Sequence, residues 1–189
     1  MEEIKVAFLD RDGTIVKEYD DNGWINRTEP EFLSNSIEGL KAISDLGYKI
    51  IIITNQGLIN KGYISWDNYN MFTSNMLRIL LENGIEIFDI FCCPHRKKEN
   101  CDCMKPKPGM ILQACKKYNI NLSQSFFAGD TTNDEGIAKY FDLDFYAIRY
   151  SPVSKYGVRV DDLLEIANIL LRKENKQIKY VKKKRDKKY

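Results

Sequence analysis

The chain has 189 residues and a formal net charge of +2, with 43% hydrophobic and 30% charged residues, which is typical of a globular protein with one main domain. No apolar run approaches the roughly 20 residues of a membrane-spanning helix, and Met1–Lys5 do not resemble a secretory signal, so we expect a cytoplasmic protein. Residues 174–189 carry a net charge of +6, which leaves −4 on the rest of the chain. This acidic body argues against a broad nucleic-acid-binding surface.

Apolar runs and turn signals predict strands that alternate with helices. Strands are expected over 4–9, 48–53, 85–91, 125–128 and 145–148. Helices are expected from Ser36 as N-cap to about 46, from Ser65 or Asp67 to about 81, over 110–118, over a short segment ending near 141, and over 160–172. This order predicts an α/β fold with three layers, in which helices cover both faces of a central parallel sheet.

Two loops and the C-terminal segment lie outside the predicted strands and helices. Residues 15–35 and 57–64 are too short to form a helical cap domain, so we expect an open site at the carboxyl ends of the strands. The expected domain covers residues 1–173, and the basic segment 174–189 is expected to be a disordered tail. We expect a monomer.

Two aspartates follow the first apolar run, and Gly13 permits a sharp turn after them. If the run is a strand, Asp10 and Asp12 point to the same side. Asp10 is then a candidate nucleophile that attacks phosphorus, and Asp12 is a candidate general acid and base. Taken alone, this pattern also fits a strand that ends in a solvated turn.

Polar residues at other predicted strand ends fit the same chemistry. Thr54 offers a hydroxyl and a backbone N–H to a phosphoryl group, and Lys105 offers a positive charge. Asp130 follows the fourth strand, with Asp134 four residues later, and together with Asp10 they form an oxygen site suited to Mg²⁺. Each residue also fits an ordinary structural role as a turn, a solvated lysine or a helix N-cap.

Four of the five cysteines lie between residues 92 and 103, together with the single histidine of the chain. Cys93, His95, Cys101 and Cys103 form a complete tetrahedral set of three thiolates and one imidazole with no open position, which predicts a structural zinc ion. Zinc would order the polar segment between His95 and Cys101 and would hold Lys105 two residues away. The alternative is a chance grouping of reduced cysteines.

In order along the chain, the motifs Asp10-Arg11-Asp12-Gly13-Thr14, Thr54-Asn55-Gln56, Lys105-Pro106 and Gly129-Asp130 with Asp134 resemble those of the haloacid dehalogenase (HAD) superfamily of Mg²⁺-dependent phosphohydrolases. The resemblance covers residues 4–150. It implies an aspartyl-phosphate on Asp10, Asp12 as general acid and base, and Thr54 and Lys105 as phosphoryl ligands. It also implies Mg²⁺ held by Asp10, the Asp12 carbonyl and Asp130, with Asp134 in a supporting role. Arg11, Asn55 and Gln56 are further candidate substrate contacts.

The cysteine loop followed by Lys-Pro is similar to the HAD branch that contains heptose 1,7-bisphosphate 7-phosphatases and histidinol-phosphate phosphatases. This resemblance implies a small phosphorylated metabolite as substrate, with a sugar bisphosphate favoured over histidinol phosphate. A polynucleotide 3′-phosphatase and a non-catalytic zinc-stapled binding protein remain alternatives, the former because of the basic tail. The chain departs from the branch at Met104, where arginine is usual, at Thr131, where lysine is frequent, and at Gly57-Leu58, where Ser-Gly is usual.

Overall fold

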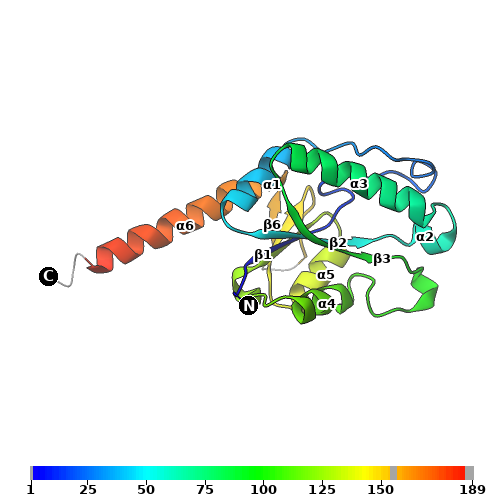
Figure 1. The fold of residues 1–189 in the computed structure, drawn as a ribbon. Helices are drawn as coiled ribbons and strands as arrows, with labels where there is room; N and C mark the ends of the chain where they lie inside the picture. Colours follow the sequence, from blue (N-terminus) through cyan, green and yellow to red (C-terminus); the bar gives the residue numbers. More distant parts are fainter. Residues whose placement is uncertain (1, 154–156, 186–189) are drawn as a thin grey trace.

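The computed structural model describes residues 2–153 and 157–185, without the side chains of 176–185. Six strands form a single sheet in which every pairing is parallel, in the order β3-β2-β1-β4-β5-β6 (Figure 1). The strands are β1 (Val6–Leu9), β2 (Lys49–Asn55), β3 (Ile87–Cys93), β4 (Phe126–Gly129), β5 (Asp144–Ile148) and β6 (Gly157–Val160). The predicted parallel α/β fold is therefore confirmed.

Helices cover both faces of this sheet. They are α1 (Ser36–Asp45), α2 (Leu58–Lys61), α3 (Trp66–Glu82), α4 (Gly109–Lys117), α5 (Thr132–Tyr140) and α6 (Leu163–Arg185), with short 3₁₀ turns at Lys97–Glu99 and Leu122–Gln124. Ala7 and Leu9 face one core with α1, α3 and α6, whereas Val6 and Phe8 face a second core with α4 and α5. This alternation is the period of a strand that is buried on both sides.

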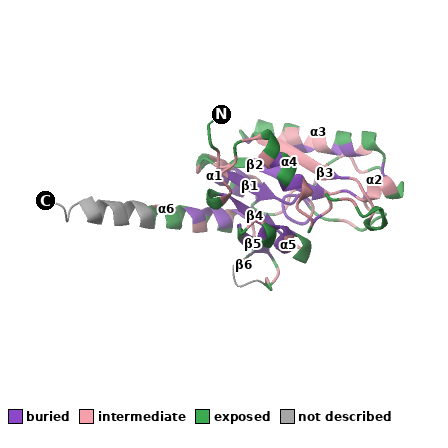
Figure 2. Ribbon diagram, turned by 90° about the horizontal axis from the view of Figure 1, so that it is seen from below, coloured by how far each residue is buried: buried purple, intermediate pink, exposed green. Residues whose placement is uncertain are grey.

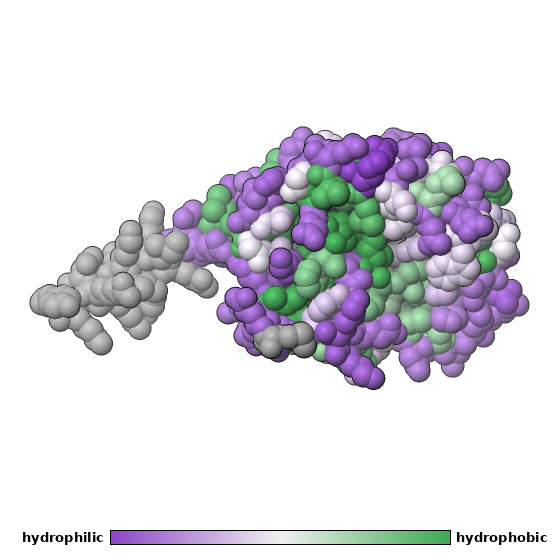
Figure 3. Space-filling view, in the orientation of Figure 1, coloured by the Kyte–Doolittle hydropathy of each residue, from purple (hydrophilic) through white to green (hydrophobic). Residues whose placement is uncertain are grey.

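Figure 2 shows the burial that results, with buried strands between partly exposed helices. The space-filling view in Figure 3 shows apolar residues across the middle of one face, where β3 forms an edge of the sheet. No helix in the described ranges is long and apolar enough to cross a membrane.

Several predicted element boundaries are wrong. Asn35, in a left-handed conformation, occupies the N-cap position of α1, and Ser36 is instead the first helical residue and is buried. Ser65 is confirmed as the N-cap of α3, where it forms a reciprocal capping box with Asn68. Strand β6 was not predicted, because a four-residue strand with two exposed positions gives little hydrophobic pattern.

The last helix begins at Leu163 and continues to Arg185, beyond the expected end near Arg172. The backbone of 174–185 is therefore helical where disorder was expected, and residues 186–189 lie outside the described part of the chain. The boundary between a domain and a tail at residue 173 stays a prediction.

Candidate active site

The candidate site lies where the strand order reverses. From β1 the chain adds β2 and β3 on one side, and it later returns to add β4, β5 and β6 on the other side. Loops leave the carboxyl ends of β1 and β4 in opposite directions, which opens a crevice between neighbouring strands. Asp10 follows β1 and Asp130 follows β4, and the Asp10 N–H donates to the Ala128 carbonyl at 3.0 Å.

Lys105 joins both sides of this crevice. Its Nζ lies 2.7 Å from Asp10 Oδ1 and 2.6 Å from Asp134 Oδ1, and the side chain is almost fully buried. Burial alone would lower the pKa of Lys105, but the carboxylates of Asp10 and Asp134 outweigh it and raise that pKa. Lys105 is therefore a permanent buried cation beside the candidate nucleophile.

Three carboxylates gather around this lysine. Ligand atoms of Asp10, Asp130 and Asp134 lie within 4.8 Å of one another. Burial and the negative charges of Asp134 and Glu18 raise the pKa of Asp130 to about 6. Asp130 Oδ1 is also buried without a hydrogen-bond partner among the described residues. Carboxylates this close repel one another unless a cation lies between them. The donor atoms here are all oxygens and one of them has no partner, which fits a hard divalent ion.

Asp134 has a supporting position in this cluster. Its side chain is fully buried, and its Oδ2 accepts hydrogen bonds from the Thr131 N–H at 3.0 Å and the Thr131 hydroxyl at 2.6 Å. Because the other oxygen pairs with Lys105, both oxygens of Asp134 are already used by the protein. Asp134 therefore positions Lys105 and the start of α5.

Asp12 and Arg11 form a separate unit. Arg11 donates from Nε to Asp12 Oδ1 at 2.8 Å and from Nη2 to Asp12 Oδ2 at 3.0 Å. The Arg11 side chain is 2% exposed, and its Cζ lies 4.9–5.4 Å from the ring centroids of Trp24, Tyr69 and Phe72. The Arg11 side chain is thus enclosed and holds Asp12. The role of Arg11 as a substrate contact stays a prediction.

The Thr54–Gln56 motif also bonds mainly to the protein. Gln56 Nε2 donates to Asp12 Oδ2 at 2.7 Å and to Thr54 Oγ1 at 2.8 Å, and the Gln56 side chain is buried. Asn55 accepts from the Lys105 N–H at 3.0 Å and donates to the Lys105 carbonyl at 3.3 Å. Gln56 thus links Thr54 to Asp12, and Asn55 fixes the backbone of Lys105. The roles of both residues as substrate contacts stay predictions.

Gly13 is required by the close approach of Asp130. Gly13 has a φ of +78°, and a Cβ at this position would lie 2.0 Å from Asp130 Oδ2. We expect Gly13→Ala to displace the Asp130 carboxylate and to lower the catalytic activity of the candidate site by about 10²-fold, the scale of a misplaced reacting group. Steady-state kinetics over a range of Mg²⁺ concentrations would measure the loss and any weaker metal affinity.

Gly62→Ala is the matched control, because Gly62 has a φ of +80° and a Cβ added there would have no atom within 4 Å. Both variants carry the strain of a left-handed alanine, about 1–2 kcal/mol. Only Gly13→Ala should lose activity. Equal losses in the two variants would contradict the role given to the Gly13–Asp130 contact.

The predicted metal ligands of the cysteine loop meet in space. Cys93 Sγ lies 3.6 Å from Cys101 Sγ and 3.2 Å from Cys103 Sγ, and the Cys101 and Cys103 sulfurs are 3.5 Å apart. His95 Nδ1 lies 3.5 Å from the Cys93 sulfur and 3.2 Å from the Cys103 sulfur. A tetrahedral ion with about 2.3 Å bonds to sulfur separates its sulfur ligands by roughly 3.8 Å, so the arrangement is compatible with a zinc site.

The cysteine loop is attached to the active site at two places. The Gln56 N–H donates to the Cys93 carbonyl at 2.7 Å, next to the link with Asp12. Lys107 Nζ donates to the Cys101 carbonyl at 2.7 Å, two residues after Lys105. An ion bound in this cluster would thus fix the segment that delivers Lys105.

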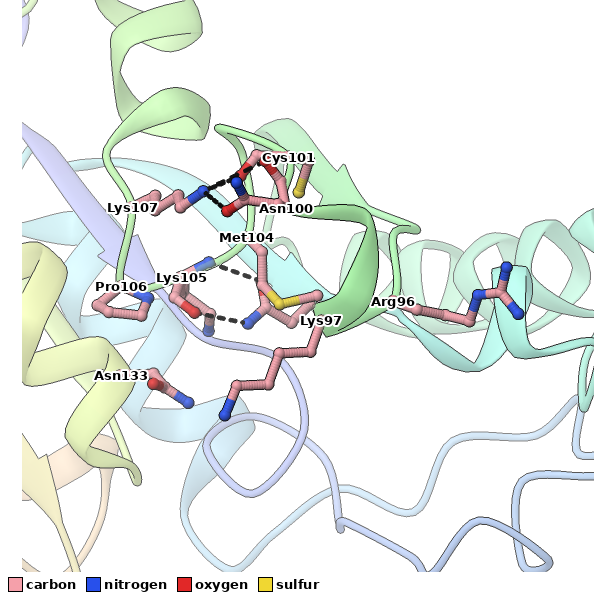
Figure 4. Close-up of a pocket in the computed structure, with 10 residues that line it drawn as sticks. Arg96, Lys97, Asn100, Cys101, Met104, Lys105, Pro106, Lys107 and Asn133 are labelled. Atoms are coloured by element: carbon pink, nitrogen blue, oxygen red, sulfur yellow. Dashed lines mark hydrogen bonds between the residues drawn. The ribbon is translucent and has the colours of Figure 1, made fainter.

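A cavity of about 340 Å³ lies between the cysteine loop and the start of α5 (Figure 4). Its lining residues are Asn55, Arg96, Lys97, Asn100, Cys101, Met104, Lys105, Pro106, Lys107 and Asn133. Lys105 lines this cavity and also pairs with Asp10, whereas the carboxylates of Asp10, Asp130 and Asp134 are not among the lining residues.

Arg149 supports the loop after β1 at the candidate site, and it was not predicted from the sequence. This residue follows β5 with a φ of +60°, and its guanidinium donates a hydrogen bond to the Gly13 carbonyl. Tyr150 also donates from its hydroxyl to the Thr131 carbonyl at 2.9 Å. Both residues directly follow a predicted strand. Because the carboxyl ends of parallel strands meet at one edge of the sheet, this position could have indicated that they lie near the site.

This fold, with Asp10 and Lys105 paired at the reversal of strand order, defines a phosphohydrolase of the HAD type. A sequence model described as polynucleotide kinase 3 phosphatase matches residues 5–184. The chain therefore belongs to this family.

Known proteins similar to the chain agree with this assignment. The D-glycero-alpha-D-manno-heptose-1,7-bisphosphate 7-phosphatase of Photorhabdus laumondii is 48% identical over 139 residues, which cover 69% of this chain and 74% of that protein. The beta-anomer 7-phosphatase of Pasteurella multocida is 39% identical over 137 residues, covering 69% and 73%. The crystal structure of D,D-heptose 1,7-bisphosphate phosphatase from B. bronchiseptica, complexed with magnesium and phosphate, matches with a TM-score of 0.83 at 23% identity, covering 90% of this chain and 99% of that one.

Proposed function

We propose that the protein is a phosphatase that removes the 7-phosphate from D-glycero-D-manno-heptose 1,7-bisphosphate. The observation that carries the reaction class is the buried Lys105 held between Asp10 and Asp134, beside the unpartnered oxygen of Asp130. The substrate is supported by the relatives that are 48% and 39% identical and are named as heptose bisphosphate phosphatases.

In the proposed mechanism, a carboxylate oxygen of Asp10 attacks phosphorus. The bond between phosphorus and the sugar oxygen breaks, and Asp12 gives that oxygen a proton as it leaves. Water then attacks the aspartyl-phosphate, Asp12 takes a proton from that water, and Asp10 and inorganic phosphate are released. The Arg11 and Gln56 contacts hold the Asp12 carboxyl for both proton transfers.

Two metal ions belong to the proposal. Asp10, Asp130 and the Asp12 carbonyl would hold Mg²⁺, which when bound neutralises charge on the transferred phosphoryl group. Cys93, His95, Cys101 and Cys103 would hold a structural zinc ion, since four protein ligands leave no position for substrate. Lys105 would contact the phosphoryl group directly, and Thr54 is a second candidate contact.

The test is phosphate release in the presence of Mg²⁺ from both anomers of heptose 1,7-bisphosphate, histidinol phosphate and a 3′-phosphorylated oligonucleotide. We expect release from the heptose bisphosphates, with the sugar 1-phosphate as the other product. The names of the two relatives differ in anomer, so the ratio between the anomers would assign the preference of this chain. Release from histidinol phosphate or from the oligonucleotide, without release from either heptose bisphosphate, would contradict the proposed substrate. No release from any substrate would favour a non-catalytic protein.

A further inference from the structure

The cavity beside Lys105 has a strongly basic wall. Its ten lining residues include Arg96, Lys97, Lys105 and Lys107 but no aspartate or glutamate. The volume of about 340 Å³ is in the range of sites for small-molecule ligands. A ligand that fills this space while its phosphoryl group lies at Asp10 is therefore expected to carry further negative charge.

Three of these four cations already have partners in the protein. Lys105 pairs with Asp10 and Asp134. Lys107 Nζ donates to Asn100 Oδ1 at 2.8 Å and to the Cys101 carbonyl at 2.7 Å. Arg96 lies 3.4 Å from Glu99, and Figure 4 shows its guanidinium pointing away from the other lining residues.

Lys97 is different. Among the described residues, its ammonium group has no hydrogen-bond or ion-pair partner, although it lines the cavity. Figure 4 shows the side chain extending past Met104 toward Asn133, which lies in the first turn of α5. Lys97 and Asn133 thus face the same space from two different elements.

The segment that carries Lys97 is restrained on both sides. Lys97 begins a 3₁₀ turn that lies between His95 and Cys101, two members of the metal-type cluster. Glu99 in this turn accepts hydrogen bonds from the Arg96 N–H at 2.5 Å and from Asn60 Nδ2 at 3.0 Å. The backbone of Lys97 is therefore held in place before a ligand binds, which reduces the entropy lost on binding.

We propose that Lys97, with Asn133 opposite, binds the phosphate of the substrate that is not hydrolysed, and so selects bisphosphates over monophosphates. This proposal rests on the proposed function, because it assigns one end of the same substrate. The need for such a cation follows from the charge of the site, since Asp10, Asp130 and Asp134 repel a second phosphate.

The experiment compares Lys97→Ala with Lys98→Ala, which makes the same change of charge at the adjacent residue. Both lysines are exposed, but only Lys97 lines the cavity. Two substrates are used, heptose 1,7-bisphosphate and p-nitrophenyl phosphate, which has a single phosphate. Loss of a charge-assisted hydrogen bond is expected to raise the KM of Lys97→Ala for the bisphosphate roughly ten- to 100-fold. The kcat/KM for p-nitrophenyl phosphate should change less than about twofold, and Lys97→Arg should restore most of the bisphosphate affinity.

An unchanged bisphosphate KM in Lys97→Ala would overturn the proposal. Equal losses with both substrates, or equal effects of Lys97→Ala and Lys98→Ala, would also overturn it, because they indicate a general change of structure or charge.

Failure of the proposed function has a separate signature. The wild type would then hydrolyse p-nitrophenyl phosphate but not the heptose bisphosphate. The role of Lys97 would still be decided by inhibition of p-nitrophenyl phosphate hydrolysis with fructose 1,6-bisphosphate and with fructose 6-phosphate. Stronger inhibition by the bisphosphate in the wild type, lost in Lys97→Ala, supports the proposal, and an unchanged ratio overturns it.

Discussion

Asp10→Asn is expected to abolish phosphate release, with a loss on the order of 10⁴-fold or more, as for other lost catalytic nucleophiles. An amide oxygen does not attack phosphorus to form a stable acyl phosphate, so the first step of the mechanism is removed. The measurement is release of inorganic phosphate at saturating Mg²⁺. Turnover near that of the wild type would contradict Asp10 as the nucleophile.

The same substitution should leave the fold intact. Burial raises the pKa of the Asp10 carboxyl, and Asp134 adds to this, although Lys105 opposes it. A group whose pKa is raised on folding makes the folded state less stable at pH values where it is ionised. Removing this charge leaves Lys105 paired with Asp134 at 2.6 Å. We therefore expect Asp10→Asn to unfold at the same or a higher temperature than the wild type at neutral pH without Mg²⁺.

Cys103→Ser is expected to cause the second large effect, the loss of zinc. Cys103 Sγ lies within 3.2–3.5 Å of the other three ligand atoms, so this substitution removes a central member of the cluster. Structural zinc contributes roughly 10–16 kcal/mol of binding free energy in small zinc-dependent domains. Here the sheet has its own core, so we expect disorder of the cysteine loop and a lower unfolding temperature rather than complete unfolding.

Activity should also fall about 10²-fold in Cys103→Ser. Lys105 follows Cys103 by two residues, so disorder of the loop would displace it, and a displaced reacting group lowers the rate by about this factor. Zinc content by elemental analysis and thermal unfolding with and without a chelator would measure the effect. Cys115→Ser is the matched control, since Cys115 is a free cysteine in α4 outside the cluster. A Cys103→Ser protein without zinc but with full stability would show that the cluster does not bind a structural metal.

The sequence was sufficient to predict which residues meet at the site, because the rule behind that prediction is topological. In a parallel sheet all carboxyl ends lie at one edge, so Asp10 and Asp130 were expected near each other, and their ligand atoms lie within 4.8 Å. The cysteine cluster was equally predictable, since three thiolates and an imidazole at this spacing are typical of a metal site when disulfides are not expected.

The directions of side chains beyond the strands could not be predicted. The expectation for Asp10 and Asp12 used the alternation of a strand, but β1 ends at Leu9, before either residue. The chain then turns through Gly13, and Asp12 bonds to Arg11 and Gln56 rather than to the partners of Asp10. The aromatic enclosure of Arg11 depends on Trp24 and Phe72, which are far away in sequence and gave no local signal.

The central position of β1 has a consequence for synthesis on the ribosome. All four residues of Val6–Leu9 are fully buried, and β4, the neighbour on one side, begins only at Phe126. At a translation rate of about 5–20 residues per second, this apolar segment waits roughly 6–24 s before both of its partners exist. For most of that interval β2 is available, but the side of β1 that later pairs with β4 has no partner and can join other nascent chains. Production of this protein should therefore respond to chaperones that shield short apolar segments during translation.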